Sequence, residues 1–431
     1  MNAGLPPGRG MAADAAWNYA ALAATALVGA AVTFLIAGRL GTAALGVFAQ
    51  LYAAHAIGAQ IAVFGAHDST QKHAAEFSGD GRDDGAVIAG SLGLVLVSAA
   101  LLAGALAALA RPIGALVSSA DVGRGLYLVA PGIVCFALNK VLFAALNGRG
   151  LLRRYAWMQF LRAAFVLSSV GGVVALDLPA YAVGGVFAAA EMLLLPCLLA
   201  AVRPPLRTAS SERPWWRRHL AFGGRGLVAA ILVETHLRVD VAMLSYFATD
   251  RAVGVYAFAS LFAEGVYQLP VVVRTVAYPT IVQLASRGDR AGVARTARRL
   301  SAVSGAVSAA AAVLVGFAYP LVAAWFDAEF VTAGWSVLLV LLAGMTVSSF
   351  VVPFDQLLLQ SGLPGRQSVL MALYVGANVA LNLVLIPPFG LLGAAAATTA
   401  SLVLAAGLLL VASRVWLGYR PSVLMHRAPA S

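Results

Sequence analysis

The sequence predicts an all-α integral membrane protein with about twelve transmembrane helices in two six-helix bundles. Its composition is the first observation: 61% of the 431 residues are hydrophobic and 11% are charged. Soluble domains have about 25% charged and 45–50% apolar residues, so this chain has too few charges to cover a water-facing surface. The other two observations are the lengths of its apolar segments and the distribution of lysine and arginine.

Twelve apolar segments are long enough to cross a bilayer, since about 20 apolar residues span a hydrocarbon core of about 30 Å. Short breaks separate most of them. The last break is Pro387-Pro388-Phe389-Gly390, where two prolines and a glycine do not continue a helix. The predicted spans are 16–37, 43–65, 86–110, 125–146, 155–176, 180–202, 222–247, 252–284, 300–325, 331–360, 367–387 and 391–413.

The predicted spans place successive loops on opposite sides of the membrane, and lysine and arginine are concentrated on one side. With the N-terminus on the cytoplasmic side, 20 of them lie inside, and four (Arg39, Arg111, Arg124 and Arg251) lie outside. Cytoplasmic loops carry the excess of positive charge, so we expect both termini in the cytoplasm and an even number of spans. The net charge of +11 has the same origin, and we expect no nucleic-acid partner.

Weak internal similarity divides the chain in two. Leu45–Ala49 (LGVFA) opens the second span, and Val253–Ala257 (VGVYA) opens the eighth. Leu146-Asn147-Gly148 after the fourth span has a counterpart in Gln360-Ser361-Gly362 after the tenth. Repeats of six spans each have the same orientation in the membrane. We therefore predict an N-terminal bundle at residues 1–208 and a C-terminal bundle at residues 209–431.

Five lysine and arginine residues fall inside the predicted spans. Arg225 lies near the cytoplasmic edge, where its side chain can reach the headgroups, which leaves Lys140, Arg162, Arg238 and Arg274. Ionisable residues are costly in a bilayer and normally face a protein interior or a water-filled cavity. Cations from both halves that converge on one cavity suit an anion, particularly phosphate, which accepts several charge-assisted hydrogen bonds. We predict that these four residues bind the substrate.

Further polar residues in the spans are candidates for ion coupling or for lining the cavity. In the eighth span, Glu264, Gln268 and Arg274 fall on one polar face. In the seventh, the four-residue spacings of Glu234 with Arg238 and of His236 with Asp240 allow a substrate site or proton relay, or simply polar packing. Asn378 and Asn382 serve as interhelical hydrogen-bonding groups or as ligands. The complete set is Glu234, His236, Asp240, Glu264, Gln268, Asp355, Asn378 and Asn382.

Motifs of soluble catalysis are absent from the sequence. It contains no phosphate-binding loop, metal-ligand cluster or nucleophile elbow. The predicted outer loops are too short to hold the catalytic arginine or histidine of a membrane polymerase or ligase. We expect a transporter without cofactor or bound metal, and not an enzyme.

Several segments resemble one family. The stretch LNLVLIPPFGLLGAAAATTAS from Leu381, LGVFAQLYA from Leu45 and the Asp240-to-Tyr256 region are similar to bacterial Wzx-like polysaccharide flippases. These flippases belong to the multidrug/oligosaccharidyl-lipid/polysaccharide (MOP) exporter superfamily. The resemblance implies two six-helix bundles around a central cavity that work by alternating access. It also implies a place in the bacterial cytoplasmic (inner) membrane and a role in lipopolysaccharide or exopolysaccharide synthesis.

The cargo that this resemblance implies is a polyprenyl-pyrophosphate-linked oligosaccharide, flipped from the cytoplasmic to the outer leaflet. Membrane lipids and the polysaccharide polymerase or export machinery are the implied partners. The alternative is a small-molecule exporter of the same superfamily, similar to the multidrug and toxic compound extrusion (MATE) transporters. Na⁺ or H⁺ would drive such an exporter through Asp240 or Asp355.

Overall fold

The computed structural model describes residues 9–203, 214–236, 238–287, 289–355, 358 and 363–417. These residues form helices and connecting turns, with no strand among them. The chain divides into two compact units, Met1–Glu234 and Thr235–Ser431. The predicted boundary between residues 208 and 209 lies outside the described residues and stays a prediction.

In the first unit, α5 packs against α2, α3, α4 and α7, while α1 packs on α6. Its core includes Leu142, Leu146 and Leu194, all fully buried. Small residues let membrane helices approach closely. A Cβ on Gly114 of α4 would lie 2.7 Å from the Cα of Gly123 in α5. The elements are α1 (Arg9–Arg39), α2 (Thr42–Val63), α3 (Ala66–Gly79), α4 (Gly85–Leu116), α5 (Ala120–Gly148), α6 (Leu152–Ala175), η1 (Ala180–Gly184), α7 (Gly185–Val202) and α8 (Trp215–His236).

In the second unit, α10 packs against α11 and α13, and α15 packs against α9 and α13. The similar pentapeptides Leu45–Ala49 and Val253–Ala257 both lie near the start of a helix, in α2 and α10 respectively. The other predicted repeat, Gln360–Gly362, lies outside the described residues. The elements are α9 (Val239–Phe247), α10 (Asp250–Ser286), α11 (Arg290–Ala323), α12 (Ala328–Thr332), α13 (Gly334–Ser349), η2 (Val352–Phe354) and α15 (Pro364–Leu417).

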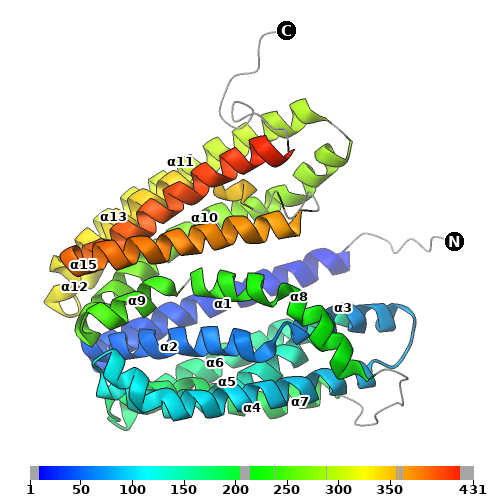
Figure 1. The fold of residues 1–431 in the computed structure, drawn as a ribbon, viewed down its shortest axis with the longest axis horizontal. Coiled ribbons are helices and arrows are strands. Elements are labelled where there is room, and N and C mark those ends of the chain that lie inside the picture. Colours follow the sequence, from blue (N-terminus) through cyan, green and yellow to red (C-terminus); the bar gives the residue numbers. More distant parts are fainter. Residues whose placement is uncertain are drawn as a thin grey trace. The chain divides into compact units, whose positions relative to one another are not determined.

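The predicted spans are present with two differences in how they are built. Within the described ranges, ten helical segments are long and apolar enough to cross a membrane. One of these, Gly365–Trp416 in α15, covers the last two predicted spans, which meet at the non-helical residue Gly390 (φ 55°, ψ −126°) (Figure 1). The predicted seventh span is broken, because α8 ends at His236 and α9 begins at Val239. The prediction of about twelve spans is confirmed.

The polar segment after the second span is a helix, although the sequence suggested only a connection. Residues Ala66–Gly79 form α3, and its Ser69, Thr70 and Ala74 are buried. Gly65 permits this arrangement with a left-handed φ of 68°, and a Cβ there would lie 2.8 Å from the Cα of Gly223 in α8. The helix therefore packs within the first unit despite its polar sequence.

His219 joins three helices at this end of the first unit. Its side chain is fully buried, with Nε2 2.9 Å from the Val87 carbonyl oxygen and Nδ1 2.9 Å from the Ser69 hydroxyl. Because a carbonyl only accepts, Nε2 donates to Val87, and Nδ1 is left to accept from Ser69. Burial lowers the pKa of His219 to about 4, and the nearby His73 adds to this effect, against the opposing hydrogen bond to Val87.

This histidine makes folding depend on pH. The unfolded chain takes up the proton near pH 6.5, whereas the folded protein resists it down to about pH 4. Its contribution is therefore intact above pH 6.5 and is lost as the pH falls toward 4. Between pH 7 and pH 5 we expect it to lower the free energy of unfolding by roughly 2 kcal/mol.

Unfolding of the detergent-solubilised protein, followed by circular dichroism across pH 5–7.5, measures this effect. The His219→Gln variant should lose less stability than wild type over the same range. His73→Gln, which removes the half-buried neighbouring ring, is the control and should keep most of the wild-type pH dependence, because burial is the larger cause of the lowered pKa of His219. If His219→Gln has the same pH dependence as wild type, the loss of stability at low pH does not come from His219.

Candidate functional site

Lys140 is an intramembrane cation with a neutral partner. It lies on α5, and its ammonium group donates to the Oε1 atom of Gln60 on α2 at 2.6 Å. The ammonium also lies 5.9 Å from the centre of the Phe136 ring. Within the described part of the chain, no carboxylate lies within 4.0 Å of it. Lys140 therefore forms no ion pair with a described residue, although the carboxylates of Glu234 and Asp68 attract its charge from a greater distance.

Arg162 is in a different situation, because a buried acid pairs with it. Its Nε and Nη2 atoms lie 2.7 and 2.6 Å from Oε1 of Glu191 on α7. The Glu191 side chain is 3% exposed, and its Oε2 accepts from the Asn139 amide of α5 at 2.9 Å. The Arg162 guanidinium also covers the Phe136 ring at 4.6 Å. This network joins α5, α6 and α7, and it neutralises one of the four predicted cations.

Asp240, on α9, is the centre of a buried polar network in the second unit. Its Oδ2 accepts from the Thr398 hydroxyl at 2.6 Å and from the Tyr256 hydroxyl at 3.2 Å. Its Oδ1 accepts from the Asn382 amide at 3.1 Å. The three donors come from the two arms of α15 and from α10. None of them is a cation, so within the described part of the chain this carboxylate accepts hydrogen bonds from neutral groups alone.

The two predicted asparagines link helices in this network. Asn378 donates to the Ser401 hydroxyl at 2.9 Å, which joins the two arms of α15. Asn382 bonds to Asn378 as well as to Asp240. Both are fully buried. Interhelical hydrogen bonding is thus one of their roles, and their role as ligands stays a prediction.

Arg274 also has an acidic partner. Its Nη1 pairs with Oδ2 of Asp355, which follows η2. Two predicted members of the polar site, one cation and one acid, are therefore brought together. The Asp355 backbone carbonyl accepts from the side chain of Gln367 at the start of α15. Of the four predicted cations, Arg162 and Arg274 are neutralised within their own units.

The remaining predicted residues lie around the break in the seventh span and on α10. Arg238 precedes α9 as its N-cap, so the four-residue spacing argument, which assumed one continuous helix, does not apply to Glu234 and Arg238. His236 lies 3.1 Å from the Tyr374 hydroxyl through Nε2, rather than bonding to Asp240. Glu264 and Gln268 are exposed on α10. The four cations are divided between the two units, so their convergence on one cavity stays a prediction.

Sequence reasoning missed several partners of these residues: Gln60, Asn139, Glu191, Tyr256 and Thr398. Glu191 had a signal, because it is the single acid in an otherwise apolar span. Thr398 stands in the Ala-Thr part of the C-terminal motif. Tyr256 lies in the Val253–Ala257 repeat and in a segment that resembles the flippases. Gln60 and Asn139 are neutral polar residues, which are ordinary in membrane helices and carry no signal of their own.

Comparison with protein families and curated sequences gives one related protein. No family model matches the chain. The curated relative is the probable flippase AglR of Haloferax volcanii, 26% identical over 207 residues. That match covers 46% of this chain and 41% of AglR, so the chain spans about two fifths of the length of this relative.

Solved structures match the chain over most of its length. The lipid II flippase MurJ in an inward closed conformation has a TM-score of 0.73 at 13% identity, covering 92% of this chain and 87% of MurJ. An inward-facing multidrug resistance MATE transporter has a TM-score of 0.71 at 14% identity, covering 91% and 94%. A MOP superfamily transporter from Pyrococcus furiosus has a TM-score of 0.59 at 14% identity, covering 94% and 93%.

These structural matches have 13–14% sequence identity, and they establish the fold. Two of the matched proteins are described as MOP superfamily transporters, and the described residues of this chain form ten helical segments able to cross a membrane. The protein is therefore a multi-pass membrane protein with the fold of the MOP superfamily transporters, as its sequence resemblance predicted.

Proposed function

We propose that this protein flips a polyprenyl-pyrophosphate-linked oligosaccharide from the cytoplasmic to the outer leaflet, for the synthesis of a cell-surface polysaccharide. Alternating access of the two units is the proposed mechanism. The relative AglR is described as a probable flippase and MurJ as a lipid II flippase, which supports a lipid-linked cargo. A membrane potential that is negative inside favours outward movement of an anion.

Lys140 is the observation that carries this proposal. An ammonium group within a membrane span is expensive, and among the residues that the structure describes its hydrogen-bond acceptor is a neutral amide oxygen. A pyrophosphate oxygen is a much better acceptor, because the hydrogen bond then joins two charges. Lys140 is thus the primary pyrophosphate ligand, and Arg162, Arg238 and Arg274 complete the proposed cationic cavity.

The 20-to-4 distribution of lysine and arginine supports a chain with both termini in the cytoplasm of a bacterial cell. The bacterial inner membrane is the proposed location, and the polysaccharide polymerase or export machinery are the proposed partners. Labelling of a Ser118→Cys variant by a membrane-impermeant thiol reagent in intact cells tests the orientation.

Flipping in proteoliposomes tests the proposed function. A polyprenyl-pyrophosphate glycan is incorporated into one leaflet, and its exposure in the other is followed with an impermeant probe. Replacing Lys140 by glutamine should reduce the rate about 10- to 100-fold, because a charge-assisted hydrogen bond of about 1.5–3 kcal/mol is lost. If wild type and Lys140→Gln flip the glycan at the same rate, Lys140 is not the pyrophosphate ligand.

The chain offers a matched control, since its other lysine is Lys72 on α3. Lys72 is exposed and pairs with Glu76 at 3.7 Å on the same helix. Lys72→Gln removes the same charge and should leave flipping unchanged. Folding of each variant is checked by size-exclusion chromatography and circular dichroism. If folded wild type shows no flipping at all, the flippase proposal fails.

A second candidate function is ion-coupled export of a small molecule. The buried Asp240 network favours it, because a carboxylate surrounded by neutral donors suits a proton or Na⁺ as its counter-charge. The similarity to MATE transporters is consistent with this function. Gradient-driven efflux of a cationic dye from proteoliposomes, without flipping of the lipid-linked glycan, would favour the exporter.

A further inference from the structure

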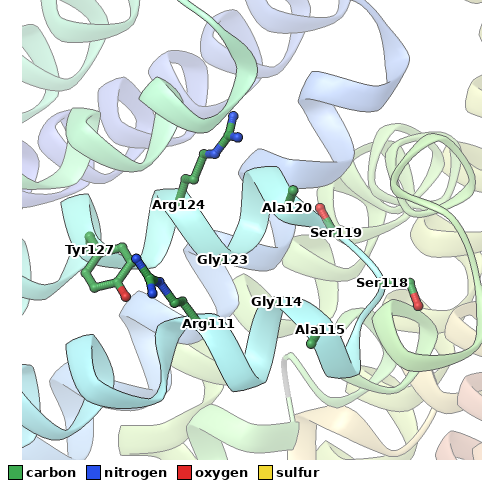
Figure 2. Close-up of a pocket in the computed structure, with 9 residues that line it drawn as sticks. All are labelled: Arg111, Gly114, Ala115, Ser118, Ser119, Ala120, Gly123, Arg124 and Tyr127. Carbon is green, nitrogen blue, oxygen red and sulfur yellow. The ribbon is translucent and has the colours of Figure 1, made fainter.

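The α4–α5 hairpin borders an open surface cavity away from the residues described above. Its volume is about 480 Å³, within the range of small-ligand sites. Arg111 of α4, Ser118 and Ser119 of the turn, and Arg124 and Tyr127 of α5 line it (Figure 2). Gly114 and Gly123, where the two helices approach closely, contribute backbone to its wall. No side chain therefore fills the space between them.

Two arginines at this cavity have no acidic partner. Among the residues that the structure describes, no carboxylate lies within 4.0 Å of Arg111 or Arg124. Arg251, predicted on the same side of the membrane, differs because it pairs with Asp327 and Glu329 at 2.6 and 2.7 Å. The outer side is predicted to hold four cations, and two of them line this one cavity. Their positive charge is thus concentrated where it is not neutralised.

The side chains provide donors on two sides of the cavity. Figure 2 shows Arg111 and Tyr127 turned toward one another from α4 and α5, whereas Arg124 extends away from them. The Arg124 guanidinium lies 5.8 Å from the centre of the Tyr181 ring. The α5 N-terminus, capped by Ser119, adds the positive end of a helix dipole. Asp121 in the same turn is not among the lining residues.

The surroundings of the cavity identify its ligand by chemistry. Guanidinium and phenol groups beside a helix N-terminus suit a phosphate group. Leu116 and Leu128 on the same hairpin are 61% and 36% exposed, as expected for side chains in contact with lipid tails. Tyrosine is typical of the headgroup level of a bilayer. We propose that this cavity binds the phosphate group of an anionic phospholipid in the outer leaflet, whatever the protein transports.

Lipid binding to the intact purified protein tests this proposal. Native mass spectrometry measures retention of phosphatidylglycerol and of phosphatidylcholine by wild type and by the Arg111→Gln/Arg124→Gln double variant. Both lipids offer a phosphate, but the two guanidinium groups repel the choline cation of phosphatidylcholine. Wild type should therefore prefer phosphatidylglycerol on the order of tenfold, and the double variant should lose this preference. Arg39→Gln is the matched control, since Arg39 is exposed, predicted on the same side and outside the cavity.

Four outcomes overturn the proposal. The first is equal retention of both lipids by wild type, and the second is an equal loss in Arg39→Gln. The third is displacement of phosphatidylglycerol by soluble glycerol phosphate at the same concentration, which indicates a site for a free phosphate. The fourth is preferential displacement by a polyprenyl pyrophosphate, which indicates a site for the transported lipid. Unchanged thermal stability shows that the variants are folded.

Discussion

Replacing Arg162 by alanine should lower the free energy of unfolding by about 3 kcal/mol. Removing one partner of a buried ion pair leaves an uncompensated charge, which typically costs about 3–5 kcal/mol. Glu191 is almost fully buried, and after the substitution it keeps only the Asn139 amide as its side-chain partner. We take the lower end because Arg162 is 30% exposed, so water partly solvates the pair. Denaturant unfolding in detergent micelles measures the loss.

A double variant separates the charge from the packing. Arg162→Met with Glu191→Leu removes both charges and keeps side chains of similar size. Replacing a buried pair by apolar residues is often neutral or stabilising, so this variant should be closer to wild type than Arg162→Ala. Asn139 still donates to the backbone carbonyl of residue 191 at 2.9 Å. If the double variant is as unstable as Arg162→Ala, the loss comes from packing and not from the buried carboxylate.

The same variants separate two roles of Arg162. As a structural partner of Glu191 it affects stability, whereas as a pyrophosphate ligand it affects flipping. If the folded double variant flips at the wild-type rate, Arg162 has only the structural role. A folded double variant that flips slowly would support the proposed cationic cavity.

Replacing Asp240 by asparagine should remove the response of transport to an ion gradient. The substitution keeps the size of the side chain but deletes the charge that a proton or Na⁺ would balance. Coupling free energies between two sites are typically about 1–3 kcal/mol, or about 5- to 150-fold. We therefore expect a gradient to accelerate wild-type transport by a factor in this range and to leave Asp240→Asn unaffected. Proteoliposomes with imposed Na⁺ or pH gradients provide the measurement.

Asp355→Asn is the comparison, since the sequence left Asp240 and Asp355 as alternatives. Asp355 pairs with Arg274, whereas Asp240 is bonded to neutral donors alone. A carboxylate that already has a cationic partner has less need of a transported cation. Asp355→Asn should therefore keep the gradient response, even if it transports more slowly. Loss of the response in Asp355→Asn and not in Asp240→Asn would reverse the assignment.

Hydropathy and charge were enough to predict the fold class, the number of spans and the intramembrane charges. These follow from hydropathy and from single residues, which are local properties of the chain. The break at Gly390 was also local, because prolines and a glycine end a helix whatever surrounds them. The α3 helix and the break in α8–α9 were not predicted. Packing stabilised α3 against its polar sequence. The break between α8 and α9 occurs without a proline or glycine, in a segment where polar residues alternate with apolar ones.

Only the tertiary structure decided which intramembrane charges are neutralised. The partners of Arg162 and Arg274 lie 29 and 81 residues away in the sequence, and Thr398 lies 158 residues from Asp240. Periodicity shows which residues share a face of one helix, but not which face of another helix packs against it. Lys140, Arg162 and Arg274 are equivalent cations in the sequence. Packing gives two of them a carboxylate and gives Lys140 the neutral oxygen of Gln60.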